Sequence, residues 1–410
     1  MTCIAEIDPI AIEVTNEINE NLNRDATTTS ATWEHEHLAK VKIRVLRGHL
    51  DAINSCKFCK FDQQILTASN DKTVRLWDFN TGAQIQCYEG HSSYVSCASP
   101  SKDMTRFASC GWDKMLHVWD TATGKIMWSS RHDGIVTCCC VSHDGKLVVS
   151  ASDMDYHIRI WDMQSGQLIH HIKDLHTSTI TSCHFSNNDD RVITTSMDKT
   201  VKFWDITTQK NTVSLTGEHI NVISDCSFSQ DERRLATVSW DKDVLIWDVP
   251  TGMYRSSGPI KLAKAHEGSV SSCAFTRDGS ILVTGSYDTS LVVWDVENCV
   301  QKLKLQGHTD WIEDVDISRD KKWLLSCSKD KTVRIWNIEN TDHIPKVIEN
   351  KRSIGLKMVK CFECGKPFSM AQVERPEDST QCVFCRMEKR INNSESQNFL
   401  REVEQDHADL

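Results

Sequence analysis

Short apolar runs recur along the central part of the chain, with turn residues between them. Typical runs are RLATVS at 234–239, ILVTGS at 281–286 and WLLSCS at 323–328. Runs of this length, bounded by Asp, Gly, Lys or Asn, are typical of β-strands. In segments such as SYDTS and SKDKT the Asp side chain can accept nearby backbone hydrogen bonds, so these segments predict tight turns. The pattern therefore predicts an all-β fold.

The strand-like runs belong to a repeat that tryptophan marks. Successive gaps between these tryptophans are 42, 42, 43, 43, 47 and 42 residues, and six of the seven are followed by Asp, the last by Asn337. A period of this length indicates an array of four-stranded propeller blades. The seven tryptophans are Trp77, Trp119, Trp161, Trp204, Trp247, Trp294 and Trp336.

Each repeat also has a His before its first strand and an Asp six residues before its Trp. The two are 22 residues apart in six repeats and 23 apart in the third. Seven copies at one repeat position indicate structural groups rather than seven active sites, so we expect no enzymatic activity. The histidines are His49, His91, His132, His176, His219, His266 and His308. The aspartates are Asp71, Asp113, Asp155, Asp198, Asp241, Asp288 and Asp330.

This pattern resembles the WD40-repeat family over residues 41–338, about three-quarters of the chain. The resemblance implies a seven-bladed β-propeller with a buried tetrad in each blade: the His, the turn Asp, the Trp, and a Ser or Thr two residues before the Asp. Such partners satisfy a buried indole and imidazole. Gly111 and Asp153 stand in place of that Ser in the second and third repeats, so those tetrads are expected to be weaker or rewired. The Ser is expected at Ser69, Ser196, Ser239, Ser286 and Ser328.

The two ends of the repeat region are expected to share one blade. Val41–Leu46, with the sequence VKIRVL, precedes the first His and matches QKLKLQ before His308. We therefore expect it to be the outer strand of a blade whose other strands come from 309–338, which closes the ring and leaves no long free sheet edge.

The resemblance also implies which positions form the top surface of the propeller. They are the residue before the turn Asp and those three and five after the His, and of these 21 positions only Lys329 and Glu313 are charged. Large apolar groups with so little charge indicate an interaction surface. The alternative is that Trp112, Trp240 and Tyr287 lean over neighbouring blades and stay half-buried. The candidate partner-binding residues are Tyr94, Trp112, Met154, Met197, Trp240, Tyr287 and Trp311.

Charge divides the chain into regions. The net charge of −10 argues against nucleic acid as the main partner of the propeller. Residues 1–40 hold eight acids and two bases, and we expect a mostly disordered arm there. Residues 346–390 hold ten bases and six acids. There is no basic segment followed by an apolar one at the N-terminus, and no run of 18 apolar residues. We therefore expect an intracellular protein with no membrane contact, in the cytoplasm, with the nucleus left open.

The chain has 18 cysteines, and a reducing compartment is expected to keep them as thiols. Five of them stand seven residues after the repeat His, where Ala98 and Val315 fill the same slot in other repeats, so the slot predicts a small buried apolar site. Cys56 and Cys59 form a CxxC that we do not expect to bind metal, because residues three apart on a strand point to opposite faces. The five are Cys56, Cys139, Cys183, Cys226 and Cys273.

A second kind of cysteine pattern follows the propeller. Cys361 and Cys364, then seventeen residues later Cys382 and Cys385, form two CxxC pairs. Four thiolates at this spacing predict one structural zinc ion with no open coordination position. We expect residues 339–356 to be a linker, 357–391 to be the zinc-ribbon or knuckle module, and 392–410 to be a disordered tail.

A propeller followed directly by a four-cysteine module also resembles certain animal WD-repeat proteins, through HTDWIEDVDISRDKKWLLSCSKDKTVRIWNIEN and TQCVFCR. That resemblance implies architecture more than activity. We expect a non-enzymatic scaffold, a monomeric propeller within a larger complex, that binds a protein or peptide on its top surface. One alternative is a WD40 substrate receptor of a ubiquitin ligase. Such receptors often carry an Arg or Lys two residues after the Asp that follows the repeat Trp, and this chain has neither there. Another is a nucleic-acid-linked factor acting through Lys357 and Lys360 of the zinc module.

Overall fold

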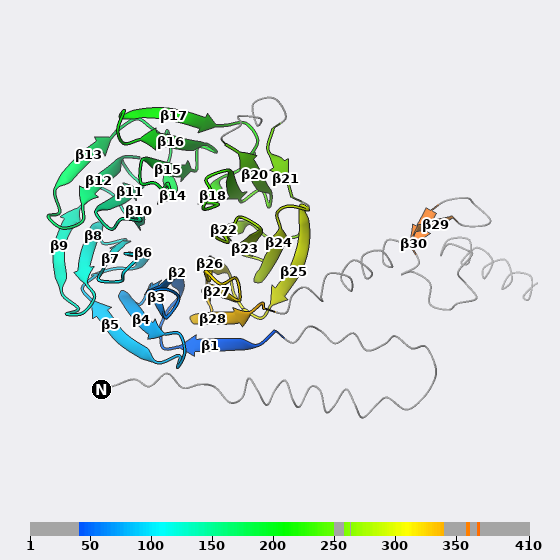
Figure 1. The fold of residues 1–410 in the computed structure, drawn as a ribbon, viewed down its shortest axis with the longest axis horizontal. Helices are drawn as coiled ribbons and strands as arrows, with labels where there is room; N and C mark the ends of the chain where they lie inside the picture. Colours follow the sequence, from blue (N-terminus) through cyan, green and yellow to red (C-terminus); the bar gives the residue numbers. More distant parts are fainter. Residues whose placement is uncertain (1–40, 250–257, 263, 340–357, 361–366, 370–410) are drawn as a thin grey trace, which may run out of the picture. The chain divides into compact units, whose positions relative to one another are not determined.

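The computed structural model describes residues 41–249, 258–262, 264–339, 358–360 and 367–369. Seven four-stranded antiparallel sheets are arranged in a ring (Figure 1), and we call them blades 1 to 7 in chain order. This confirms the predicted all-β, seven-bladed propeller. No helix occurs among the described residues, so that part of the chain offers none long and apolar enough to cross a membrane.

Each blade runs from an inner strand near the centre of the ring to an outer strand at the rim (Figure 1). The inner strands are β2 (Ile53–Cys59), β6 (Val95–Pro100), β10 (Val136–Val141), β14 (Ile180–Phe185), β18 (Ile223–Phe228), β22 (Val270–Phe275) and β26 (Ile312–Ile317). The second strands are β3 (Gln64–Ser69), β7 (Arg106–Gly111), β11 (Leu147–Ser152), β15 (Arg191–Ser196), β19 (Arg234–Ser239), β23 (Ile281–Ser286) and β27 (Trp323–Ser328). The third strands are β4 (Thr73–Asp78), β8 (Met115–Asp120), β12 (Ile158–Asp162), β16 (Val201–Asp205), β20 (Val244–Asp248), β24 (Ser290–Asp295) and β28 (Thr332–Asn337). The outer strands are β5 (Gln84–Glu89), β9 (Ile126–Arg131), β13 (Leu168–Ile172), β17 (Lys210–Leu215), β21 (Ile260–Lys261), β25 (Val300–Gln306) and β1 (Ile43–Arg47).

The ring closes as predicted, because β1 from the start of the repeat region pairs with β28 from its end. The antiparallel register runs from Ile43 opposite Trp336 to Arg47 opposite Thr332. Beyond the ladder, the N–H of Asn337 donates to the carbonyl of Lys42 at 2.9 Å. Blade 7 is therefore built from both ends of the propeller.

Burial follows the position of a strand within its blade. In β3, β7 and the other second strands, five of six residues are buried, because neighbouring blades cover both faces of the sheet, and such strands read as continuous apolar runs. Outer strands are more exposed: β9 has no buried residue. The core consists of clusters between blades, such as the one that joins Trp77 and Leu46 to Ile335.

The cysteine slot is buried as predicted. The five cysteines, with Ala98 and Val315, are each at most 5% exposed. Cys56 and Cys59 belong to two different core clusters, on opposite faces of β2, so this CxxC pair does not hold one ion. Thirteen described cysteines are free thiols.

The turns between second and third strands are tight, as predicted. In blade 1 the N–H of Thr73 donates to the Asp71 carboxylate at 3.0 Å, and Lys72 between them has φ of 71°. The aspartate bond offsets the cost of a left-handed backbone at a non-glycine residue.

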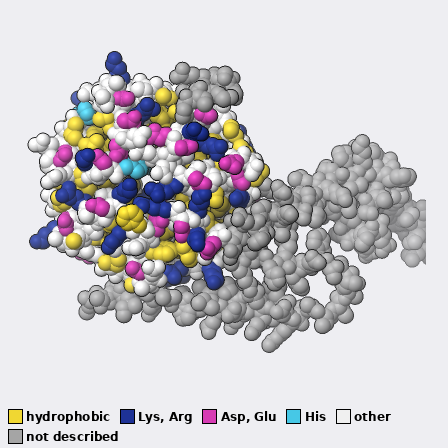
Figure 2. All heavy atoms as spheres, viewed as in Figure 1, with side chains coloured by type: hydrophobic (Ala, Val, Ile, Leu, Met, Phe, Trp, Pro, Cys, Tyr) yellow, Lys and Arg dark blue, Asp and Glu magenta, His cyan; other side chains and the backbone are white. Residues whose placement is uncertain are grey.

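The propeller face shown in Figure 2 carries Lys and Arg side chains interspersed with Asp and Glu side chains, with hydrophobic groups between them. The C-terminal hairpin is described by itself: β29 (Met358–Lys360) pairs antiparallel with β30 (Pro367–Ser369). Its connecting residues 361–366 lie outside the described part.

Candidate functional site

A hydrogen-bonded tetrad of His, turn Asp, hydroxyl and Trp is complete in blades 1, 2, 5, 6 and 7. In blade 1, Nδ1 of His49 is 2.7 Å from the Asp71 carboxylate and Nε2 is 2.8 Å from Oγ1 of Thr67. The indole N–H of Trp77 donates to the same Oγ1 at 2.9 Å. All these groups are buried or nearly so. The network gives the ring nitrogens of His49 and Trp77 the hydrogen-bond partners that buried polar groups need.

The hydroxyl of the tetrad is not the one predicted. It stands on the second strand four residues before the turn Asp, and five before it in blade 3. Ser69, at the predicted position, serves the turn instead: it accepts the N–H of Asp71 at 3.1 Å and donates to the carbonyl of Ala52 at 2.9 Å. Residues two apart on a strand share a face, so spacing alone did not separate them. The seven hydroxyls are Thr67, Ser109, Ser150, Thr194, Thr237, Thr284 and Ser326.

The prediction of a weakened tetrad in blade 2 is therefore wrong. Ser109 accepts the indole N–H of Trp119 at 2.8 Å and lies 2.7 Å from Nε2 of His91. Gly111 has a different role, because a Cβ there would lie 2.3 Å from the carbonyl oxygen of Tyr94. A close approach of two backbones requires this glycine.

Blade 3 is rewired, as predicted, although not through loss of the Ser. Ser152 pairs with Val136 just as Ser69 pairs with Ile53, so the extra residue lies in the turn. The Asp155 carboxylate is bonded to Ser152 and Arg159 rather than to the repeat histidine. Consequently Nδ1 of the buried His132 has no hydrogen-bond partner among the described residues. Burial, together with Arg159, lowers the pKa of His132 to about 4.

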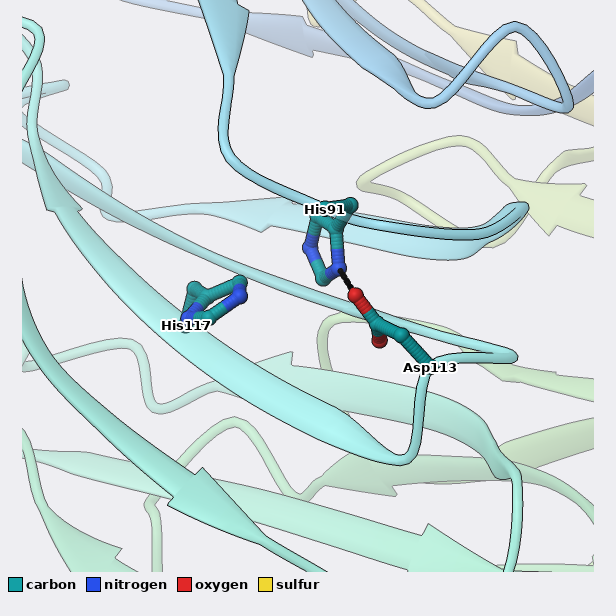
Figure 3. A group of neighbouring side chains, drawn as sticks. All are labelled: His91, Asp113 and His117. Carbon is teal, nitrogen blue, oxygen red and sulfur yellow. Dashed lines mark hydrogen bonds and ion pairs between the residues drawn. The ribbon is translucent and has the colours of Figure 1, made fainter.

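A cluster of His91, Asp113 and His117 has donor atoms close enough together to suggest a metal site (Figure 3). Both nitrogens of His91 already belong to the tetrad, and Nδ1 of His117 is 2.7 Å from Oγ of Ser129. The place of His117 on the third strand is held in blade 3 by Arg159, which pairs with its own turn aspartate. Burial, with His91 nearby, lowers the pKa of His117 to about 4. The three side chains are therefore explained by their structural roles in blade 2, without a metal ion.

The predicted top-surface positions do meet at one end of each blade. The residue before the turn Asp donates its backbone N–H to the carbonyl of the residue three after the His, as Trp112 does to Tyr94 at 2.8 Å and Trp240 to Val222 at 3.0 Å. In blade 3 the extra residue shifts this bond to Asp153, which leaves Met154 as the projecting residue of a longer turn.

Six of the seven predicted partner-binding residues are exposed. Met154 is 71% exposed and Trp112 is 53% exposed. Tyr94, Met197, Trp240 and Trp311 are each between 38% and 45% exposed. Tyr287 is half-buried, as the alternative interpretation proposed for it, because its ring stacks on Trp311 of the next blade at a centroid distance of 4.7 Å. The role of these residues in binding stays a prediction.

Four of the five aromatic residues form two pairs. Tyr94 and Trp112 of blade 2 have ring centroids 5.4 Å apart. The Tyr287–Trp311 stack carries Nζ of Lys329, which lies 3.9 Å from the centre of the Trp311 ring. These distances fit aromatic and cation–π contacts.

The two charged positions of this surface neutralise each other. Nζ of Lys329 is 3.2 Å from the Glu313 carboxylate. Burial raises the pKa of Glu313, and Lys329 opposes that rise. The 21 predicted surface positions therefore offer a partner almost no net charge.

Two apolar residues of the same end were missed. Leu50 and Ile220, each directly after a repeat His, are both 76% exposed, and their N–H groups donate to the turn aspartates. The same position holds polar residues in the other blades: Ser92, Asp133, Thr177, Glu267 and Thr309. Alignment on the histidines would have shown this contrast.

The predicted zinc ligands Cys361, Cys364, Cys382 and Cys385 lie outside the described residues. The described strands β29 and β30 bracket 361–366, the segment that holds the first CxxC pair.

A ring of seven four-stranded blades, five of them with a complete tetrad, defines a propeller of the WD-repeat class. The family "WD domain, G-beta repeat" matches the chain at 40–78, 82–120, 125–162, 166–205, 209–248, 258–295 and 297–337. The chain therefore belongs to the WD40-repeat family.

Among individual proteins, the chain is similar to the human WD repeat-containing protein 88. The two are 48% identical over 392 residues, which is 94% of this chain and 83% of that protein. The U3 small nucleolar RNA-associated protein 15 homolog of Xenopus tropicalis is 30% identical over 159 residues, 38% of this chain and 30% of that protein. The probable E3 ubiquitin ligase complex SCF subunit sconB of Arthroderma benhamiae is 44% identical over 57 residues, 14% of this chain and 9% of that protein.

Proposed function

We propose that this protein is a non-enzymatic scaffold that captures a protein or peptide partner on the top surface of its propeller. The observation that carries the proposal is the set of exposed apolar side chains at one end of the blades, with Leu50 and Ile220 added to the predicted residues. Soluble proteins seldom expose so many large apolar groups together without a partner.

The chemistry of the surface narrows the class of partner. Because Lys329 and Glu313 pair with each other, the 21 predicted positions carry almost no net charge. Its rigid aromatic pairs suit a segment that is apolar or uncharged at its centre, with polar groups only at its rim.

The test compares partner capture by wild type and by Trp240→Ala and Trp311→Ala. Proximity labelling or affinity capture should lose the same set of proteins in both variants, at least about tenfold if each tryptophan is a binding hot spot of ~1.4 kcal/mol or more. Because both rings are partly exposed, thermal unfolding should change little.

The matched control is Phe61→Ala. Phe61 is 63% exposed and lies in the turn after β2, at the opposite end of blade 1 from the top surface. Its loss should leave capture unchanged. Capture that survives in both tryptophan variants, or that is lost equally in the Phe61 variant, would refute the top surface as the binding site. Recovery of a cullin-type ligase would instead favour the substrate-receptor alternative.

We also propose one structural zinc ion on Cys361, Cys364, Cys382 and Cys385. The spacing of the two CxxC pairs supports it, and so does the β29–β30 hairpin around the first pair, since zinc-bound thiolates commonly occupy such a turn. Metal analysis of the full chain should find one zinc per molecule. Cys382→Ser should abolish it, whereas Cys59→Ser should not. An equal zinc content in both variants would refute the assignment.

A further inference from the structure

In blades 3, 4 and 5 the residue five after the repeat His links its own blade to the next one. The hydroxyl of Thr137 donates to the carbonyl of Ile180 at 2.7 Å, and the hydroxyl of Ser224 donates to the carbonyl of Val270 at 2.6 Å. Each accepting residue is the first of the inner strand of the following blade. A hydroxyl has one hydrogen, so this bond leaves it no hydrogen to donate to a ligand.

Blade 1 has an asparagine at this position. Nδ2 of Asn54 donates to the carbonyl of Val95 at 2.7 Å, which is the same link to the next blade. The same Nδ2 also donates to Oδ1 of Asn70 at 2.7 Å. The backbone N–H of Asn70 donates to the carbonyl of Ala52 at 2.9 Å, which holds this residue at the turn. The Val95 carbonyl fixes which end of the Asn54 side chain is the nitrogen, because two oxygens would repel each other there. We call Asn54 and Asn70 the amide pair.

The amide pair has one acceptor and one donor left over. Within the described part of the chain, Oδ1 of Asn54 and Nδ2 of Asn70 have no hydrogen-bond partner. Both residues are half-buried, and neither of these two atoms is a buried one, so both are accessible to solvent. An acceptor next to a donor is the complement of a peptide group, which offers one N–H and one carbonyl.

Exposed apolar side chains lie on both sides of the amide pair. Val95, which accepts from the pair, directly follows Tyr94, and the Tyr94 ring pairs with that of Trp112 at a centroid distance of 5.4 Å. On the other side, Leu50 of blade 1 is 76% exposed. Nζ of Lys331, from the turn of blade 7, donates to the Leu50 carbonyl at 2.9 Å. Contacts therefore connect blades 7, 1 and 2 at this end, with the amide pair in the middle.

We propose that the amide pair binds the backbone of an extended peptide segment of the partner. A backbone N–H of this segment donates to Oδ1 of Asn54, and a backbone carbonyl accepts from Nδ2 of Asn70. Main-chain bonds of this kind contribute affinity for an extended segment, whereas its apolar side chains contact Leu50 and Tyr94 and contribute specificity. The inference rests on the proposed function, and it adds the conformation of the partner and the residues that recognise its main chain.

Two substitutions remove the outward groups and keep bonds of the framework. Asn54→Ser introduces the residue that blade 5 uses for the same link, so the bond to the Val95 carbonyl is kept and the outward oxygen is lost. Asn70→Asp keeps an oxygen that accepts from Asn54 and replaces the outward donor by a second oxygen. Asn80→Asp is the matched control, because Asn80 is exposed and follows β4 of the same blade at the opposite end from the turn that holds Asn70.

The probe is a linear peptide selected on the full chain from a random library displayed on phage, and calorimetry measures its affinity. Asn54→Ser and Asn70→Asp should each weaken binding at least about tenfold, whereas Asn80→Asp should leave it unchanged. Thermal unfolding of the three variants should stay close to that of wild type. N-methylation of the one backbone N–H that Asn54 accepts should also weaken binding to wild type about tenfold. The same methylation should cost about twofold or less with Asn54→Ser, because that variant no longer has the accepting oxygen.

The outcomes separate this inference from the proposed function. Peptides that bind both asparagine variants as tightly as wild type, but that Trp311→Ala no longer binds, would overturn the role of the amide pair and leave the top surface in place. Peptides that bind all of these variants equally, or a library that yields no binder, would overturn both. Affinity that no N-methylation changes, but that replacement of an Asn or Gln of the peptide abolishes, would show a side-chain amide as the ligand and overturn the assignment to the main chain.

Discussion

At the scale of single residues, one hydroxyl group holds the His and Trp rings in place in every blade except blade 4, where only the His is bonded to it. In blade 5, Oγ1 of Thr237 is 2.8 Å from Nε2 of His219 and accepts the indole N–H of Trp247 at 2.9 Å. Because these groups are buried, each would be costly to leave without a partner. Ser239, two residues further on, receives only the turn N–H of Asp241 at 3.1 Å.

Substitution in blade 5 should separate these two roles. Thr237→Val keeps the side-chain shape but leaves both rings unsatisfied, so the free energy of unfolding should fall by about 2–4 kcal/mol. Ser239→Ala removes one turn hydrogen bond and should cost about 1 kcal/mol. Chemical denaturation of the two variants measures both. Equal losses, or a larger loss in the Ser239 variant, would contradict the tetrad assigned here.

At the scale of strands, the closure of blade 7 depends on β1. This strand supplies the outer edge of the blade through a five-residue register with β28, and its Leu46 is 3% exposed in the core. The apolar match between Val41–Leu46 and QKLKLQ was enough to predict this pairing, because outer strands repeat the same alternation. The sequence could not show how short β21 is. The gap of 47 residues between Trp247 and Trp294 is longer than the others, so the repeat does not locate the outer strand there.

Removal of residues 1–48 should therefore destabilise the whole propeller. Loss of Leu46 burial contributes about 1.5–3 kcal/mol, and each lost ladder hydrogen bond about 1 kcal/mol more. Thermal unfolding should show a clear fall in Tm, and the exposed edge of β28 should promote association. Removal of residues 1–40 is the control, because it leaves β1 in place. Equal Tm values for the two truncations would contradict the closure.

At the scale of the whole molecule, the seven turn aspartates bind protons less readily in the folded protein than in the unfolded chain. Burial favours the neutral carboxyl, but hydrogen bonds from the repeat histidines and from the turns prevail, so every one of the seven pKa values is lowered. In Asp155 and Asp241 the pKa falls to about 2. The blades therefore share one sensitivity to acid.

The unfolding free energy should fall steeply in acid. A carboxyl with a lowered folded pKa contributes stability above its unfolded pKa of about 4, and that stability is lost as pH falls toward about 2. His132 and His117, with a folded pKa of about 4, add an earlier loss below about 6.5, because the unfolded chain takes up their protons first. Calorimetry from pH 7 to 3 measures the effect. A constant Tm over that range would exclude it.

The sequence by itself determined the propeller, the number of blades and their closure. These features follow from periodicity, because each repeat must bury the same positions against its neighbours. Only the tertiary structure decided which of two hydroxyls on one strand face joins the tetrad, and how the extra residue of blade 3 leaves His132 without a partner. Only it brought together His184 and Asp225, which lie on neighbouring blades. Contacts between blades depend on how the ring closes, and spacing within a repeat does not report that.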